Sequence, residues 1–376
     1  MRILIPTVDY PPIRGGISSV ALHVSRELAR LGHEVMVVAP RFPGVDAFDQ
    51  AEPVKVLRFR GYRFGWLRLV PLLIAVRPYL KKSDLVLAVN VAYGGIIGLW
   101  ARRGGMRYVA FAYAYEFLKF RRRRLLGALL RRVYSNARGV VAISRFTRDN
   151  LLEFGVPAEK IEVIHPGAPA VREFCAEDIA RIKRRFAADG GRVILGVGRF
   201  VPRKGHITLV RAMPRILERI PDAVLVLVGE GPCLYDAVYE ANELGVRNSV
   251  LFPGSLSEDD LAGLYHACEV FALPTGDLGA GQVEGFGLVF AEAQAYGKPV
   301  VAGRSGGVVD AVLDGETGIL VEPDQPEALA DAILSLLENP ARAQELGENG
   351  RRRVETELNW TRFTERLLEM VEARGP

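Results

Sequence analysis

The chain has 376 residues, of which 49% are hydrophobic and 25% charged, and a net charge of +5 at pH 7. This length suits two domains, and the composition is typical of a soluble globular protein. Three scattered cysteines, Cys175, Cys233 and Cys268, exclude a disulfide framework and predict reduced thiols in a cytoplasm. The N-terminus has no apolar signal segment, and the longest uncharged run, residues 85–101, is shorter than the ~20 apolar residues of a membrane-spanning helix. We therefore expect a cytoplasmic protein.

The first half of the chain alternates apolar runs with helical patterns. RILIP (2–6) is followed by the glycine-containing loop PPIRGGISS, by an amphipathic segment ending near residue 32, and by EVMVVAP (34–40). This strand–loop–helix–strand spacing predicts a parallel sheet. Further predicted strands are DLVLAV (84–89), RYVAFAY (107–113) and GVVAIS (139–144). The first half is therefore predicted to be a doubly wound α/β domain.

The same pattern starts again after HPGAP (165–169), which is the best candidate for a linker. The predicted strands are RVILGVGR (192–199), AVLVLVGEG (223–231), SVLFPG (249–254), VFALPT (270–275) and PVVAG (299–303). The predicted helices are 205–220, 233–244, 258–267, 286–297 and 325–338, with a last one near 360–374. We therefore expect two doubly wound domains with a cleft between them. Because ligands of such sheets bind at the carboxyl ends of the strands, the loops there are the candidates for a site.

Three of these loops carry residues suited to anions. Gly15 and Gly16 follow the first strand and allow a close backbone approach at a helix N-terminus, although they also suit a simple tight turn. Arg199 and Lys204, in GRFVPRKGH, place two cations on one strand-end loop. This pair suits a diphosphate, and the alternative is a solvated basic turn.

The third loop is VEGFGLVFAE (283–292). Glu284 is expected at its mouth and Glu292 about two turns along the helix that follows. The free amides of that helix offer a second anion-binding element. The alternative for Glu292 is a solvated helix position. Ser305-Gly306-Gly307 forms a further loop that permits close approach.

Five motifs occur in the second half of the chain: Glu-x7-Glu in EGFGLVFAE, GRFVPRKG, AVLVLVGEGP, VLFPG and AGRSGG. With these motifs at these intervals, the chain resembles the family 4 retaining glycosyltransferases, which have the GT-B fold. The resemblance covers nearly the whole chain and is strongest over residues 192–325. It implies two Rossmann-like domains that face each other across a deep cleft: an acceptor-binding domain of residues 1–168 with the C-terminal helix 358–376, and a nucleotide-sugar donor-binding domain of residues 169–357. The segments VPRKG and VEGFGLVFAEAQAYGKPVVAG are most similar to phosphatidylinositol-mannoside-type mannosyltransferases that use GDP-mannose.

The resemblance implies roles for individual residues. Arg199 and Lys204 are expected to hold the donor diphosphate, Glu284 to lie near the transferred sugar and Glu292 to bind the ribose. The other implied donor contacts are Gly15, Gly16, Gly229, Glu230, Val250, Leu256, Phe286, Gly287, Leu288 and Val289. The family works without a metal or other cofactor, and this sequence has no DxD motif and no His/Asp/Glu cluster with ligand spacing.

One position departs from the family pattern. Many members carry His-Gly-x-Glu after the fourth strand of the first domain, where the histidine contacts the transferred sugar. Here the pattern aligns with Tyr113-Ala114-Tyr115-Glu116. A tyrosine donates a hydrogen bond but carries no charge near neutral pH. Tyr113 therefore either makes the sugar contact in place of the histidine, or indicates that the donor sugar differs or that the enzyme is slow or inactive. The alternative is a large residue that merely packs at the strand end.

The first half is also strongly basic. Residues 1–170 hold 27 Lys and Arg against 12 Asp and Glu, a net charge of +15, whereas the rest is −10. The run Arg121–Arg124, and Trp66, Leu67 and Leu69 in another arginine-flanked segment, fit peripheral binding to an anionic bilayer. The alternative is an unevenly charged, solvated surface. Nucleic acid fits less well, because no reader motif is present.

The leading hypothesis is a retaining, metal-independent glycosyltransferase that moves a hexose, with mannose from GDP-mannose favoured, to a lipid-linked or saccharide acceptor. A UDP-glucose-type donor stays open. A second hypothesis is a nucleotide-sugar-binding protein with little transferase activity, argued from Tyr113. A sugar phosphorylase or epimerase does not fit the length and motifs.

Overall fold

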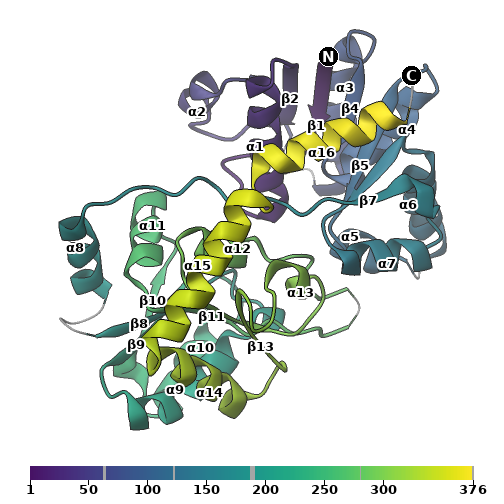
Figure 1. The fold of residues 1–376 in the computed structure, drawn as a ribbon. Coiled ribbons are helices and arrows are strands. Elements are labelled where there is room, and N and C mark those ends of the chain that lie inside the picture. The colour runs from purple at the N-terminus through teal and green to yellow at the C-terminus, as the bar shows by residue number, and fades with distance from the viewer. Residues whose placement is uncertain (62–64, 122, 187–190, 280, 375–376) are drawn as a thin grey trace. The chain divides into compact units, whose positions relative to one another are not determined.

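The computed structural model describes residues 1–61, 65–121, 123–186, 191–279 and 281–374 (Figure 1). The chain divides into two compact units. The first unit is Met1–Pro166 with Trp360–Pro376, and the second unit is Gly167–Asn359. These boundaries lie close to those expected at residues 168 and 358. The chain thus returns to the first unit through its last helix, drawn in yellow in Figure 1.

The first unit is built on a parallel seven-stranded sheet in the order β3-β2-β1-β4-β5-β6-β7. Its strands are β1 (Arg2–Pro6), β2 (Glu34–Pro40), β3 (Lys55–Phe59), β4 (Leu85–Ala88), β5 (Arg107–Ala112), β6 (Gly139–Ala142) and β7 (Ile161–Val163). Its helices are α1 (Gly16–Arg30), α2 (Asp46–Ala51), α3 (Leu69–Leu80), α4 (Ile96–Arg102), α5 (Tyr115–Leu118), α6 (Arg124–Asn136), α7 (Arg145–Glu153) and α16 (Trp360–Ala373). The strand order reverses between β1 and β4, which is where a doubly wound sheet opens a ligand site.

Both faces of this sheet are covered, as the continuous apolar strands require. Ala110 and Ala112 of β5 belong to a buried cluster with side chains of α3, α4 and α6. Phe111, between them, contacts Phe363 of α16 with ring centroids 6.0 Å apart. The C-terminal helix also stacks Trp360 on His23 of α1, at 5.0 Å. The last helix is therefore part of the core of the first unit.

The second unit is built on a parallel six-stranded sheet in the order β10-β9-β8-β11-β12-β13. Its strands are β8 (Arg192–Val197), β9 (Ala223–Val228), β10 (Val250–Gly254), β11 (Val270–Leu273), β12 (Val300–Gly303) and β13 (Gly318–Val321). Its helices are α8 (Ala176–Phe186), α9 (His206–Arg219), α10 (Leu234–Glu243), α11 (Glu258–Ala267), α12 (Leu288–Ala295), α13 (Val308–Ala311), α14 (Pro326–Leu337) and α15 (Pro340–Thr356). The order reverses between β8 and β11, so the loops after these two strands flank the expected site.

The structure confirms the two doubly wound α/β sheets that the sequence predicted. Every strand predicted from an apolar run is present, with shifts of a few residues at its ends. The strands β3, β7 and β13 were not predicted, and neither were the helices α8, α13 and α15 of the second unit. No helix among the described residues is long and apolar enough to cross a membrane.

Candidate functional site

The loop after β8 lies against the loop after β9. The amide of Gly198 donates to the carbonyl of Val228 at 3.0 Å, and the amide of Phe200 donates to the carbonyl of Glu230 at 2.9 Å. Between these two bonds, Arg199 is exposed, and its side chain forms no ion pair with the described residues. Its guanidinium is therefore free to meet an anion at the carboxyl edge of the sheet.

Lys204 ends the short 3₁₀ turn Pro202–Lys204 and is buried. Its Nζ lies 2.8 Å from Oε2 of Glu284. Arg203, the residue before it, places Nη1 3.0 Å from the same oxygen. Burial alone raises the pKa of Glu284, but Lys204 and Arg203 outweigh it and leave that pKa below its ordinary value. The structure thus joins two predicted residues in a buried ionic cluster with a third residue that the sequence did not single out.

The segment after Glu284 turns sharply into α12. Gly287 is the N-cap of this helix, with φ 91°, and no side chain of the described residues caps the helix. A Cβ at Gly287 would lie 2.5 Å from the ring of Phe290, so the turn requires glycine. Phe286 is buried, whereas Leu288 and Val289 in the first turn are half-buried. Because the helix has no side-chain cap among the described residues, its first amides stay a candidate anion-binding element.

Glu292 lies in the middle of α12 and accepts a hydrogen bond from the hydroxyl of Tyr265 in α11 at 2.9 Å. Burial raises the pKa of this carboxyl, while the hydrogen bond and the charge of Lys204 oppose the shift. The charge of Lys204 thus lowers the pKa of both glutamates, and its ammonium contacts Glu284 directly. Tyr265 was not predicted, because it belongs to another helix.

The remaining predicted residues of the second unit lie around the ends of β9 and β10. The amide of Gly229 donates to the carbonyl of Gly254 at 2.9 Å, which brings these two strand ends together. Leu256 follows the end of β10 and is half-buried. Val250, in contrast, is the first residue of β10, fully buried and paired with Leu225 at the amino end of the strand.

In the first unit, the loop after β1 leads to Gly15 and Gly16 as predicted. Gly15 is the N-cap of α1, and in the part of the chain that the structure describes no side chain caps this helix either. Asp9, in the same loop, accepts a hydrogen bond from the side-chain amide of Asn90, which follows β4. Burial raises the pKa of Asp9. Asp9 and Asn90 thus join the loops at the switch point of this sheet, and the sequence did not single them out.

Tyr113 and Glu116 follow β5 and form a buried polar group with Tyr134 of α6. Glu116 Oε1 accepts from the backbone amide of Tyr113 at 2.6 Å and from the hydroxyl of Tyr134 at 3.1 Å. The second carboxylate oxygen and the hydroxyl of Tyr113 are both buried, and neither has a hydrogen-bond partner among the described residues. Burial raises the pKa of Glu116 to about 7 and, with the charges of Glu116 and Asp9, raises that of Tyr113 well above its ordinary value.

The basic surface of the first unit is centred on the start of α6. Arg121, Arg123 and Arg124 are exposed, and Leu125 keeps 88% of its surface accessible. Leu67 and, on α3, Val70 and Ile74 are also exposed, whereas Leu69 is half-buried. Arg122 and the side chain of Trp66 lie outside the described residues.

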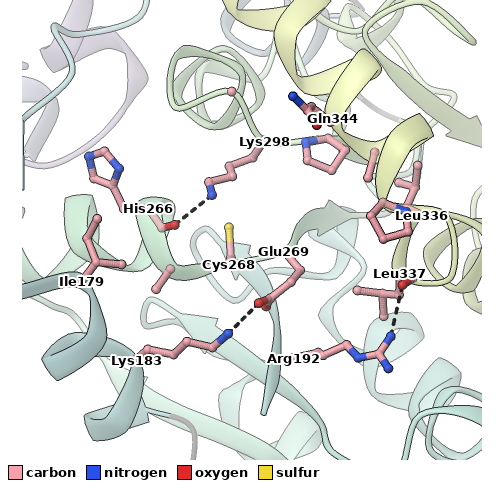
Figure 2. A pocket seen from close by; sticks show the side chains of 15 residues that line it. Ile179, Lys183, Arg192, His266, Cys268, Glu269, Lys298, Leu336, Leu337 and Gln344 are labelled. Carbon is pink, nitrogen blue, oxygen red and sulfur yellow. Dashed lines mark hydrogen bonds and ion pairs between the residues drawn. The ribbon is translucent and has the colours of Figure 1, made fainter. Parts of the chain in front are cut away.

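The second unit also contains a cavity of about 520 Å³ at the amino ends of its strands (Figure 2). It is lined by charged side chains that already have partners, as the dashed lines of Figure 2 show. These contacts are Lys183–Glu269 at 2.6 Å, Lys298 to the carbonyl of His266 at 2.8 Å and Arg192 to the carbonyl of Leu337 at 3.1 Å. Because ligands bind at the carboxyl ends of such strands, this cavity is not the predicted donor site.

Comparisons with known proteins identify the family. Residues 14–172 match the model described as Glycosyltransferase Family 4, and residues 178–353 match the one described as Glycosyl transferases group 1. A GDP-mannose-dependent alpha-(1-6)-phosphatidylinositol monomannoside mannosyltransferase of Mycolicibacterium smegmatis is 34% identical over 99% of this chain and 98% of its own. The chain belongs to glycosyltransferase family 4.

The chain is also similar to family members of lower sequence identity and to proteins of known structure. A GDP-mannose-dependent monoacylated alpha-(1-6)-phosphatidylinositol monomannoside mannosyltransferase of Corynebacterium glutamicum is 28% identical over 99% of this chain and 98% of its own. Sucrose-phosphate synthase from Thermosynechococcus elongatus is 26% identical with a TM-score of 0.80, covering 99% and 98% of the two chains. Anabaena HepE, solved with UDP and glucose, is 21% identical with a TM-score of 0.84, covering 99% and 100%. The family 4 chain is thus a glycosyltransferase with the GT-B fold.

Proposed function

We propose that this glycosyltransferase moves a mannosyl residue from GDP-mannose to a lipid-linked or saccharide acceptor, with retention of configuration and without a metal ion. The observation that carries the proposal is the 34% identity over 99% of the chain to an enzyme named as GDP-mannose-dependent. The residues expected to bind the donor support it as well, because Lys204 contacts Glu284 at 2.8 Å and its charge lowers the pKa of Glu292.

In this proposal, Arg199 and Lys204 bind the donor diphosphate. Departure of the nucleoside diphosphate builds negative charge on its terminal phosphate, and fixed cations stabilise that charge. The uncapped N-terminus of α12 adds amide donors at the same edge of the sheet. Glu292 binds the ribose, and the loops at Gly229, Glu230 and Leu256 surround the base. These groups together supply the stabilisation that other glycosyltransferases obtain from a metal ion.

The anomeric configuration is retained because the acceptor attacks the anomeric carbon from the same face that the leaving group departs from. The acceptor oxygen forms its bond to the anomeric carbon as the bond from that carbon to the diphosphate oxygen breaks. The acceptor proton passes to the departing phosphate, so that no protein base is required. Glu284 lies near the transferred sugar and, as a carboxylate, favours the positive charge that develops on its ring.

The acceptor is proposed to be lipid-linked and to be met at an anionic membrane surface. The exposed arginines at the start of α6 lie next to exposed Leu125, and this combination suits peripheral binding to a bilayer. Two of the named relatives act on phosphatidylinositol mannosides, which are lipids of this kind.

Two experiments test the proposal. A thermal-shift panel with GDP, UDP, ADP and their sugars should show the largest stabilisation with GDP-mannose, because a ligand that binds only the folded state raises its stability by mass action. A transfer assay with GDP-mannose and phosphatidylinositol mannosides should then give product with the donor's anomeric configuration. A larger stabilisation by UDP-glucose would show that the donor is UDP-glucose and not GDP-mannose. Binding of a nucleotide sugar without transfer would favour the second hypothesis, a nucleotide-sugar-binding protein with Tyr113 in place of the usual histidine.

A further inference from the structure

Arg203 contacts Glu284 although no family role is assigned to it. Its Nη1 lies 3.0 Å from Oε2 of Glu284, and Nζ of Lys204 lies 2.8 Å from the same oxygen. The side chain of Glu284 is only 16% exposed. A buried carboxylate with a single hydrogen-bonded cation is already a complete pair, so the second cation at the same oxygen needs an explanation.

Both cations act on the charge of Glu284. Burial favours its neutral form, whereas the charges and hydrogen bonds of Lys204 and Arg203 together leave its pKa below the ordinary value. Lys204, however, has a second proposed partner, the diphosphate of the donor. An ammonium group that turns toward a diphosphate binds the carboxylate less strongly, because it shares its donors and its charge between the two anions.

Arg203 is placed to remain with Glu284 when this happens. The amide of Gly276, beyond β11, donates to the carbonyl of Arg203 at 2.8 Å and fixes the backbone there. Its guanidinium is 28% exposed and stays charged at any pH at which the protein folds. Lys204 is thus the cation nearer the interior, and Arg203 is an independent support for the same carboxylate.

We propose that Arg203 is a positioning residue, which keeps Glu284 ionised and in place while Lys204 binds the diphosphate of a nucleotide sugar. This inference rests on the proposed function, because it takes from it the role of Lys204. The two neighbouring cations then have different roles, since Lys204 stabilises the leaving group and Arg203 stabilises the carboxylate beside the transferred sugar.

The test compares Arg203→Gln and Arg203→Lys with the wild type in steady-state transfer, over pH 5–9, and in GDP binding by calorimetry. Arg203→Gln should lower kcat about 10–100-fold, the effect of losing one charge-assisted hydrogen bond, and should move the acidic limb of the kcat profile to higher pH. The KM for the donor and the Kd for GDP should change less than about 3-fold, since neither depends mainly on Glu284. Arg203→Lys should restore most of kcat, because it returns the charge.

Arg211→Gln is the matched control. Arg211 is an exposed arginine on α9 that pairs with Glu240 at 2.7 Å, outside the site, so its loss should leave kcat unchanged. A wild-type kcat and pH profile in Arg203→Gln would overturn the inference. So would a loss of GDP affinity as large as that in Lys204→Ala, since Arg203 would then bind the diphosphate itself. If the wild type transfers no sugar from any nucleotide sugar, it is the proposed function that fails.

Discussion

The backbone amide of Tyr113 donates to Oε1 of Glu116 at 2.6 Å and closes the turn that follows β5. Ala114, inside this turn, has φ 78°, a left-handed conformation that is unfavourable for alanine. Tyr134 of α6 donates to the same oxygen at 3.1 Å. Glu116 therefore holds a strained turn at the position where the family usually carries its histidine.

Replacement of Glu116 by glutamine should change how stability depends on pH. Burial raises the pKa of this carboxyl from 4.5 to about 7, so the folded state favours its neutral form. The corresponding stabilisation is complete below pH 4.5 and is lost as the pH rises through 7. Glutamine stays neutral, so Glu116→Gln should gain up to about 3 kcal/mol in free energy of unfolding, relative to the wild type, between pH 5 and pH 8.

Urea unfolding of both proteins at the two pH values measures this difference. Glu153→Gln, at an exposed carboxyl on α7, is the control and should show almost no such change. An equal difference between Glu116→Gln and the wild type at both pH values would show that Glu116 does not titrate in this range.

Removal of the Tyr113 hydroxyl should lower activity without lowering stability. The hydroxyl is buried and has no partner among the described residues, so a phenylalanine loses no protein hydrogen bond. If the hydroxyl donates to the transferred sugar, Tyr113→Phe should reduce kcat/KM by about 10-fold, the effect of one neutral hydrogen bond. Tyr113→His should retain activity, because histidine also donates. Unchanged kinetics in Tyr113→Phe would remove the hydroxyl from the site.

The sequence predicted all the interior strands of the two sheets but, of the four edge strands, only β10. Central strands such as β5 and β8 are continuous apolar runs, because helices cover both of their faces. The strands that were not predicted, β3, β7 and β13, are all edge strands of the two sheets. KVLRF and IEV are mostly half-buried, and their mixed composition gives no apolar run. Local sequence therefore contains little signal for them.

The site was predicted in the same uneven way. Lys204, Glu284 and Glu292 lie in motifs that each belong to one strand–loop–helix unit. Because such a unit fixes the spacing of its residues along the chain, these three residues can be predicted from the sequence. Tyr265 and Arg203 reach the glutamates from other elements of the unit, and only the folded sheet brings them together. Arg203 lies inside the motif GRFVPRKG, but its spacing gives no reason to prefer it to a solvated residue.

Arg199→Ala should separate catalysis from stability. Arg199 is exposed and forms no ion pair with the described residues, so its loss should change the midpoint of thermal unfolding little. If it stabilises the leaving diphosphate, kcat should fall roughly 10²–10³-fold, as when one preorganised donor is removed. Lys204→Ala should lose as much activity but also some stability, because it leaves Glu284 with one cation. Wild-type turnover in either variant would show that this loop does not hold the diphosphate.

Gly229→Ala should disrupt the paired loops after β8 and β9. A Cβ at Gly229 would lie 2.1 Å from the carbonyl oxygen of Gly198, which is backbone and has no side chain to move aside. The variant should therefore unfold at a lower temperature and bind GDP more weakly. Gly245→Ala is the control, because Gly245 also has positive φ, 69°, but a Cβ added there would meet no atom of the described residues within 4 Å. Equal losses in both variants would attribute the effect to backbone strain alone.

Neutralisation of the arginines before α6 should weaken binding to anionic membranes. Arg121, Arg123 and Arg124 are exposed beside Leu125, and each basic residue near an anionic surface contributes about 1 kcal/mol. The triple glutamine variant should thus bind phosphatidylserine vesicles about 100-fold more weakly in a flotation assay. The control is Arg215, Arg219 and Arg342 changed to glutamine, which removes the same charge from the surface of the second unit. Equal binding of the wild type to neutral and anionic vesicles, or equal losses in the two triple variants, would show that this surface does not dock on lipid. The acceptor would then have to reach the enzyme from solution.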